Sequence, residues 1–172
     1  MAGDRLSYSI GETSRGWIGV AATERGVSRL TLPQPTEGQA VESLGIEAVA
    51  SASPDDEALS SLTARMESYY EGEEQEFGDV ELDLSERTEF QRQVLESVRS
   101  IPRGQVRSYA QVAASVGRPN AARAVGAAMA SNPVCVIIPC HRVIGSDGSL
   151  AGFGGGLELK RRMLELEGVS VG

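Results

Sequence analysis

The chain has 172 residues, of which 41% are hydrophobic, and a formal net charge of −8. This length suits one large domain or two small ones, and the hydrophobic content excludes a wholly disordered chain. No apolar run approaches the roughly 20 residues of a membrane-spanning helix, and the start lacks the apolar stretch of a signal peptide. One histidine and two cysteines are too few for a structural zinc site or a disulfide framework. We therefore expect a cytoplasmic protein with no membrane contact, metal or cofactor.

Charge is distributed unevenly along the chain. Residues 1–84 carry five basic and 17 acidic side chains, a net charge of −12, whereas residues 85–172 carry 11 basic and seven acidic side chains, a net charge of +4. The fifty residues 97–146 contain six arginines and no Asp or Glu. A solvated surface without a charged ligand normally mixes both signs. We therefore expect the second half alone to bind a polyanion such as nucleic acid.

The first half, residues 1–84, is predicted to be an α+β domain. Three short strand-like segments separated by glycine-containing turns, within residues 6–32, indicate an antiparallel meander. Ser53 and Pro54, followed by acids, predict the start of a helix that continues to Gly72 with apolar side chains at helical spacing. Residues 80–84 indicate a further strand or an extended linker. Because this half offers no group of catalytic character, we assign it a supporting role.

The second half, residues 85–172, is predicted to be mainly helical. Two capping-box patterns, Thr-x-x-Gln from Thr88 and Ser-x-x-Gln from Ser108, each open a helix. A glycine-containing turn and Asn120 then lead into a third helix over residues 121–130. Two short helices joined by such a turn indicate a helix-turn-helix, although a plain helical hairpin has the same pattern.

The third helix consists almost wholly of Ala and Gly, with Arg123 in its first turn. Such a thin helix can approach another surface closely. It lacks the cluster of Gln, Asn and Ser side chains that reads bases in the major groove. We therefore expect contact that is independent of DNA sequence, in the minor groove, with Arg123 long enough to probe the base stack.

Three further features lie towards the C-terminus. Residues 143–150 predict a hairpin around the turn 145–148, which would form a wing. Four glycines surround Phe153, and such a loop allows the backbone to approach a ligand closely, although a flexible linker has the same composition. Apolar spacing predicts a final helix over residues 159–166, with Lys160 and the two arginines after it on the outer face.

The strongest chemical signal is the pair Cys140 and His141. His141 is the sole histidine of the chain, and an imidazole beside a thiol can take its proton and stabilise the thiolate. The apolar run 134–138 predicts a buried strand that Pro139 ends, which would hold the thiol rigidly. The alternative is that Cys140 is a small core residue and His141 a surface residue, since cysteine is often buried.

Together these segments resemble the O6-alkylguanine-DNA alkyltransferases, which are the methylated-DNA–protein-cysteine methyltransferases. The similarity is specific over about residues 88–168 and weak over residues 1–80. It implies a small ribonuclease-H-like N-terminal domain and a winged helix-turn-helix domain over residues 85–172. The matching segments are 108–109 (SY), 121–126 (AARAVG), 132–134 (NPV), 138–143 (IPCHRV), 154–157 (GGGL) and 167–168 (EG).

The resemblance implies transfer of an alkyl group from O6-alkylguanine in double-stranded DNA, and from O4-alkylthymine, to Cys140. His141, through a water molecule, would accept the thiol proton, and Glu167 would orient the imidazole, in the manner of a catalytic triad. Asn132 corresponds to a hinge beside the active-site turn. The alkyl group stays on the sulfur, so each molecule reacts once. The protein is expected to act as a monomer.

The resemblance also assigns residues to the flipped nucleotide and the DNA. Arg123 would fill the space that the nucleotide leaves, and Tyr109 would help to rotate it and donate a hydrogen bond to the guanine ring. Phe153 lies where many relatives have tyrosine, so its ring can line the pocket but cannot donate to O6. The complete set of residues that the resemblance assigns to substrate and DNA binding is Tyr109, Arg118, Ala122, Arg123, Val143, Phe153 and Gly154.

Three alternatives stay open on the residues alone. The first is an alkyltransferase-like protein that marks lesions without repairing them, but in such proteins the nucleophile is replaced, and here Cys140 is present. The second is a winged-helix regulator with a structural cysteine, which leaves Tyr109 and Glu167 unexplained. The third is a cysteine hydrolase, for which neither an oxyanion-hole pattern nor a separate histidine is found.

Overall fold

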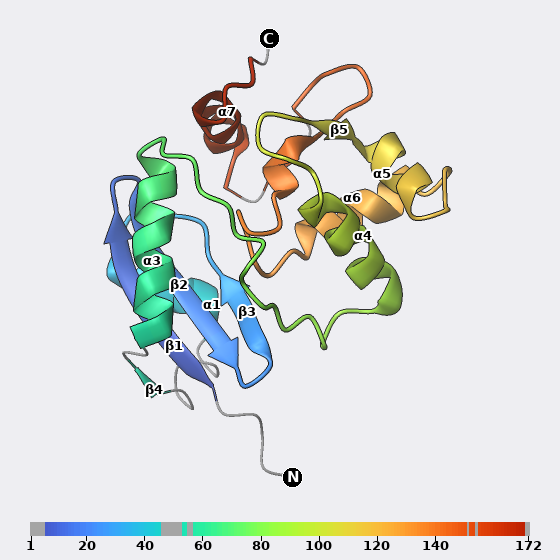
Figure 1. Cartoon of the computed structure of the whole chain (residues 1–172). Helices are drawn as coiled ribbons and strands as arrows, with labels where there is room; N and C mark the ends of the chain where they lie inside the picture. Colours follow the sequence, from blue (N-terminus) through green and yellow to red (C-terminus); the bar gives the residue numbers. More distant parts are fainter. Residues whose placement is uncertain (1–5, 46–52, 55–56, 151, 154, 171–172) are drawn as a thin grey trace. The chain divides into compact units, whose positions relative to one another are not determined.

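The computed structural model describes residues 6–45, 53–54, 57–150, 152–153 and 155–170 (Figure 1). Its contacts divide the chain into two compact units. The first comprises the residues up to Leu84 together with Pro133–Cys135, and the second comprises Ser85–Asn132 and Val136–Gly172. Each unit combines helices with short strands, so the predicted mixture of α and β structure is confirmed. Two consecutive domains were expected, but the first unit also takes three residues from the second half.

A four-stranded sheet forms the centre of the first unit. The strands are β1 (Ser7–Thr13), β2 (Gly16–Thr23), β3 (Gly26–Leu30) and β4 (Ser53–Pro54), in the order β3-β2-β1-β4. β2 pairs with β1 and with β3, and both pairings are antiparallel, as predicted for a meander. β4 runs parallel to β1. The prediction that Ser53 and Pro54 open a helix is wrong, because they form this edge strand, where proline is tolerated.

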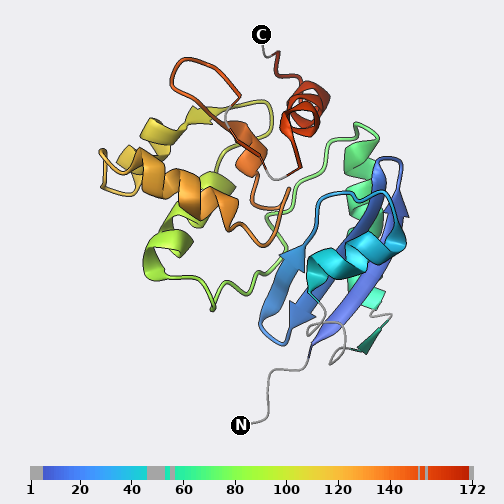
Figure 2. The ribbon, with the colours of Figure 1, turned by 180° about the vertical axis from the view of Figure 1, so that it is seen from behind.

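Two helices cover opposite faces of this sheet, α1 (Glu37–Leu44) and α3 (Glu57–Tyr70) (Figures 1 and 2). The sequence predicted α3 but not α1, although the Thr36 side chain caps α1 by accepting the N–H of Gln39. Both helices lie close to the sheet. A Cβ atom on Gly11 would collide with Cγ2 of Thr63 in α3, so a larger residue there would force the threonine to shift.

The segment Pro133–Cys135 extends the first unit's sheet at β3. The Leu30 N–H donates to the Pro133 carbonyl at 2.8 Å, and the Cys135 N–H donates to the Leu30 carbonyl at 3.2 Å. The predicted strand over 134–138 is therefore wrong in its extent. Val136 has a φ of 74°, in the left-handed region that β-branched residues rarely adopt, and the chain turns there instead of continuing as a strand.

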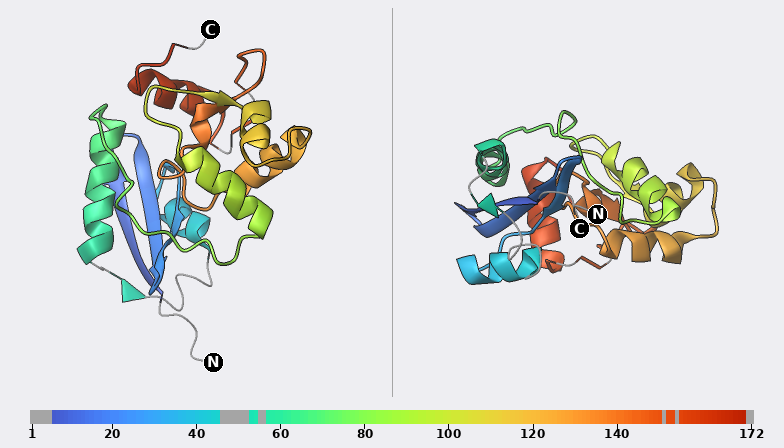
Figure 3. Two further views of the ribbon diagram at one scale, coloured as in Figure 1. Left: turned by 45° about the vertical axis from the view of Figure 1, so that its right-hand side comes forward. Right: turned by 90° about the horizontal axis from the view of Figure 1, so that it is seen from below.

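Three helices of the second unit pack against one another (Figure 3): α4 (Glu89–Arg99), α5 (Tyr109–Ser115) and α6 (Ala122–Ala130). Both predicted capping boxes are confirmed, since each N-cap side chain and each N3 glutamine bonds the partner backbone. The third helix begins one residue later than predicted. Its N-cap is Ala121, without a side-chain hydrogen bond, so the cap expected from Asn120 is wrong.

The predicted wing forms only its turn. The Gly145 N–H donates to the Ser149 carbonyl at 2.8 Å, but the strand β6 (Val143–Ile144) does not pair with residues 149–150. It pairs in parallel with β5 (Arg107–Ser108), the strand that leads into α5. The segment that follows Cys140 and the segment that leads into α5 are thus joined by main-chain pairing within one unit.

Candidate functional site

Cys140 begins a tight turn of 3-10 helix, η1 (Cys140–Arg142). The Cys140 N–H donates to the Ile138 carbonyl at 2.8 Å, and the Arg142 N–H donates to the Pro139 carbonyl at 2.9 Å. The Asn132 side chain donates to the same Ile138 carbonyl at 2.9 Å, which ties the two ends of the intervening loop together. Cys140 is half-buried and forms no disulfide with Cys135. The thiol therefore lies on a turn whose backbone is fixed on both sides.

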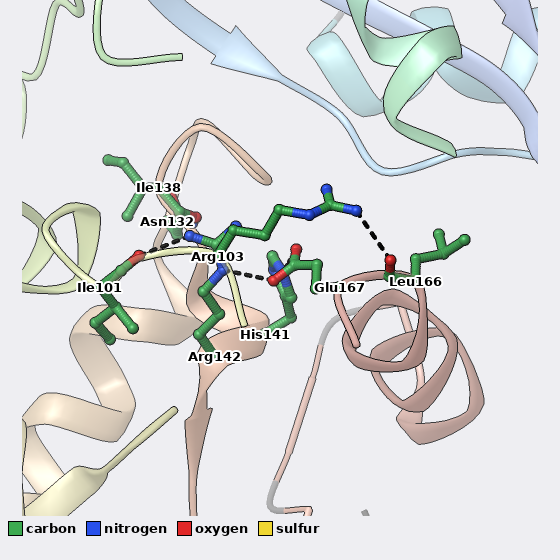
Figure 4. A network of polar contacts seen from close by, with 8 residues as sticks. All are labelled: Ile101, Arg103, Asn132, Ile138, His141, Arg142, Leu166 and Glu167. Atoms are coloured by element: carbon green, nitrogen blue, oxygen red, sulfur yellow. Dashed lines mark hydrogen bonds and ion pairs between the residues drawn. The ribbon is translucent and has the colours of Figure 1, made fainter. Parts of the chain in front are cut away.

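His141 and Glu167 form a buried pair within this unit. Nε2 of His141 lies 2.6 Å from Oε2 of Glu167, and both side chains are 0% exposed. Nε of Arg142 donates to the other carboxylate oxygen at 2.7 Å, and its Nη1 donates to the Ile101 carbonyl at 2.6 Å. Figure 4 shows the carboxylate between the imidazole and the guanidinium. One carboxylate thus binds two consecutive side chains of η1.

These contacts determine the protonation states. Burial raises the pKa of Glu167, but the hydrogen bonds and charges of His141 and Arg142 outweigh it and lower that pKa to about 2. An ionised carboxylate only accepts hydrogen bonds, so Nε2 of His141 carries the proton between them and Nδ1 keeps the lone pair. Burial lowers the pKa of His141 below 6.5, more than contact with Glu167 raises it. The imidazole is therefore neutral at pH 7 and able to accept a proton.

Lys160 lies where the sequence did not predict it. It was predicted on the outer face of the last helix, α7 (Leu157–Leu166), but its side chain is completely buried. Its Nζ donates to the Val143 carbonyl at 2.6 Å and lies 5.9 Å from the centre of the Tyr109 ring. Burial lowers the pKa of Lys160 to about 8, against the opposing effect of a negative Cys140. At pH 7 it is a buried cation whose charge interacts with Cys140.

Tyr109 is the first residue of α5, directly after the capping Ser108, and its ring is half-buried. Burial raises its pKa, and the negative charge of a Cys140 thiolate raises it further. The phenol is therefore protonated at neutral pH and is a hydrogen-bond donor. Four residues assigned from the sequence share one environment in the structure: Tyr109, Cys140, His141 and Val143.

The side chain of Arg123 is exposed in the first turn of α6, and Ala122 beside it is half-buried. The Arg118 guanidinium carbon lies 5.3 Å from the centre of the Phe90 ring, so this exposed arginine also packs on α4. Phe153 is half-buried. Gly154 lies outside the described residues. In the described part of the chain, no three His, Cys, Asp or Glu side chains gather closely enough to hold a metal ion.

The arrangement defines a protein of mixed α and β structure in which a cysteine, a histidine and a glutamate share one site. Residues 89–169 match the model of the family described as 6-O-methylguanine DNA methyltransferase, DNA binding domain. The methylated-DNA–protein-cysteine methyltransferase of Methanosarcina acetivorans is 37% identical over 163 residues, which are 95% of this chain and 99% of that protein. The Mycobacterium tuberculosis protein of the same name is 50% identical over 114 residues, 66% of this chain and 68% of the relative.

Solved structures give the same result. A crystal structure of Mycobacterium tuberculosis O6-methylguanine methyltransferase matches with a TM-score of 0.77 and 38% identity, over 94% of this chain and 92% of that one. Mycobacterium tuberculosis OGT in complex with DNA matches with a TM-score of 0.78 over the same shares of the two chains. The chain belongs to the methylated-DNA–protein-cysteine methyltransferase family.

No helix within the described residues combines the length and the apolar character that crossing a bilayer requires.

Proposed function

We propose that the protein repairs DNA by moving the alkyl group of O6-alkylguanine to Cys140, as a methylated-DNA–protein-cysteine S-methyltransferase. The observation that carries the proposal is the buried His141–Glu167 hydrogen bond of 2.6 Å, one residue from a half-buried thiol in a member of this family. Glu167 holds the imidazole with its lone pair on Nδ1, and the low pKa of His141 keeps that lone pair available.

The reaction is a displacement at the alkyl carbon. The thiol proton passes through a water molecule to His141, the Cys140 Sγ–C bond forms, and the C–O6 bond breaks. The electron pair of that bond stays on guanine, which takes up one proton to become the normal base. Lys160, as a cation, stabilises the thiolate before the transfer. The product is a thioether, which water does not cleave, so each molecule reacts once.

The reactive carbon lies inside an intact duplex, so the nucleotide has to leave the stack, which costs a few kcal/mol. Arg123 has the length and the exposure to occupy the vacated space from the minor groove, and the small side chains of α6 allow that helix to approach. Tyr109 donates a hydrogen bond to the extruded guanine. The main chain at Val143 and Gly154 meets the base edges, with Phe153 lining the pocket. Asn132 holds the turn, and Arg118 and Ala122 contact the DNA backbone.

Further parts of the proposal concern substrates and organisation. An alkyl group on O4 of thymine presents the same C–O bond to the sulfur, so we include O4-alkylthymine. The segment from 85 onwards contains every group used in the chemistry, which suits a monomer with a winged helix-turn-helix reaction domain and a ribonuclease-H-like supporting domain over residues 1–84. The proposed reaction uses neither a metal nor a cofactor. We place it in the cytoplasm.

The test is incubation with a duplex oligonucleotide that carries a labelled methyl group on O6 of one guanine. We expect one label per protein molecule, located on Cys140 by peptide mass spectrometry, and no second turnover. Cys140→Ser should lose the transfer, while the matched variant Cys135→Ala keeps it. Binding of the lesion without transfer would support a lesion-marking protein instead, and equal binding of damaged and undamaged duplexes without transfer would support a regulator.

A further inference from the structure

Glu167 lies at an electrostatically unfavourable end of its helix. It is the C-cap residue of α7, and the last turn of this helix carries no basic side chain. The C-terminal carbonyl groups of a helix lack intrahelical donors and form the negative end of its dipole. A carboxylate at this end is repelled, so its fixed position against His141 requires donors and cations from other segments.

Arg103 supplies such a cation from outside the helix. It follows α4 in the sequence, its side chain is half-buried, and its Nη2 donates to the Leu166 carbonyl at 2.9 Å. Leu166 directly precedes Glu167, so the bonded carbonyl belongs to the peptide unit that carries the glutamate. Figure 4 shows the Arg103 guanidinium reaching this carbonyl at the end of α7, while Glu167 faces His141.

A second arginine, Arg142, connects η1 to the segment that contains Arg103. Arg142 of η1 donates to the carbonyl of Ile101, two residues before Arg103, and to Glu167. The segment from Ile101 to Arg103 is thus held by the catalytic turn and itself holds the end of α7. Two charge-assisted hydrogen bonds in series fix the turn, the segment and the helix end relative to one another.

We propose that Arg103 is a positioning residue for alkyl transfer: by holding the Leu166 carbonyl, it keeps the Glu167 carboxylate in contact with His141. In this role Arg103 acts through Glu167 and not on a reacting atom. This role rests on the proposed function. It makes the segment after α4, and not only the cysteine turn and α7, a determinant of the reaction rate.

The first test separates rate from DNA affinity. Single-turnover transfer is measured over a range of lesion-duplex concentrations for Arg103→Ala, Arg103→Gln and Arg103→Lys. Displacing a reacting group by about 1 Å can cost roughly 100-fold in rate, so for an indirect contact we expect the limiting rate constant of Arg103→Ala to fall by roughly tenfold. The half-saturating DNA concentration should change by less than about twofold. Arg103→Lys, which restores a cationic donor, should recover most of the rate, and Arg103→Gln less.

The matched control is Arg162→Ala, because Arg162 is also an arginine at α7 but forms an exposed ion pair with Glu158. It should leave the limiting rate unchanged. If Arg103→Ala has the wild-type limiting rate per folded molecule and only a lower melting temperature, Arg103 is a helix cap and the proposal is wrong.

The second test does not depend on activity. Since His141 is the sole histidine, its ring proton signals in NMR report one titration without assignment. Weaker contact with Glu167 removes support for the imidazolium, so Arg103→Ala should lower the pKa of His141 in the same direction as Glu167→Gln, by a smaller amount. An unchanged or raised pKa contradicts the positioning role. Failure of wild-type protein to transfer the methyl group refutes the proposed function instead, whereas the titration still tests the contact.

Discussion

Nε2 of His141 lies 2.6 Å from Oε2 of Glu167, and neither side chain is exposed to solvent. The same carboxylate accepts from Arg142 at 2.7 Å. A buried carboxylate is costly unless it is paired and hydrogen-bonded, and here both oxygens are used. The pair therefore fixes the orientation and the tautomer of the imidazole beside Cys140 before any substrate binds.

Glu167→Gln should uncouple this pair while keeping its shape. The amide can still accept from Nε2, but it no longer stabilises the imidazolium by its charge, so the pKa of His141 should fall further below 6.5. We expect a limiting transfer rate lower by on the order of 100-fold, since general base catalysis contributes about 100- to 10,000-fold. Single-turnover transfer and NMR titration of the histidine measure the two effects. The control Glu165→Gln, on an exposed position of α7, should match wild type in both, and an equal loss in the control would refute the role of Glu167.

Lys160→Met should weaken the nucleophile. The substitution keeps most of the apolar stem but removes the cation near Cys140, so the fraction of reactive thiolate should decrease. In a Cys135→Ala background, we expect alkylation by iodoacetamide at pH 7 to slow by on the order of tenfold, because a nearby opposite charge has that effect in a partly buried site. Arg162→Met, an exposed change on the same helix, is the control. Undiminished thiol reactivity in Lys160→Met would remove Lys160 from the proposed mechanism.

The last helix illustrates what the sequence can predict and what it cannot. Apolar spacing predicted its existence correctly but placed Leu159, Met163 and Leu166 on the inner face. The structure buries Lys160, Met163, Leu164 and Glu167. The prediction missed the buried face by one residue. Two of the buried residues are charged, and hydrophobic periodicity treats charged residues as exposed. The spacing of seven residues between Lys160 and Glu167, two helical turns, is the signal that could have placed both on one face.

Local signals succeeded where they decide the structure by themselves. The capping boxes at Thr88 and Ser108 and the β1–β3 meander depend on neighbouring residues, and all were predicted. Two of the failures occurred where a distant segment intervenes. Residues 134–138 were predicted as one strand, but pairing of Val134 and Cys135 with β3 is followed by the left-handed Val136. Likewise β6 pairs with β5 and not within a hairpin. No local pattern specifies such partners.

Arg123→Ala should impair repair more than folding. The side chain is exposed in the first turn of α6, so its loss should change the melting temperature by little, because exposed substitutions usually shift stability within about 0.5 kcal/mol. We expect single-turnover repair of a lesion duplex to fall roughly tenfold or more. Unstacking the nucleotide costs a few kcal/mol, and without Arg123 no side chain fills the vacated space to offset that cost. Arg92→Ala, an exposed arginine on α4, is the control for net charge. Binding of both variants should weaken with rising salt. Equal losses of stability and activity in Arg123→Ala would argue against insertion into the stack.

Acid should destabilise the fold through Glu167. Its pKa is about 2 in the folded protein against an ordinary value of 4.5, so between these values the unfolded chain binds more protons than the folded one. The stabilisation is fully present above about pH 4.5 and is lost as the pH falls towards 2. Urea unfolding at pH 7, 4.5 and 3 should show a loss on the order of a few kcal/mol below pH 4.5 in wild type. Glu167→Gln should show a smaller loss below pH 4.5 and Glu165→Gln the wild-type loss; identical profiles for all three proteins would mean that Glu167 titrates normally.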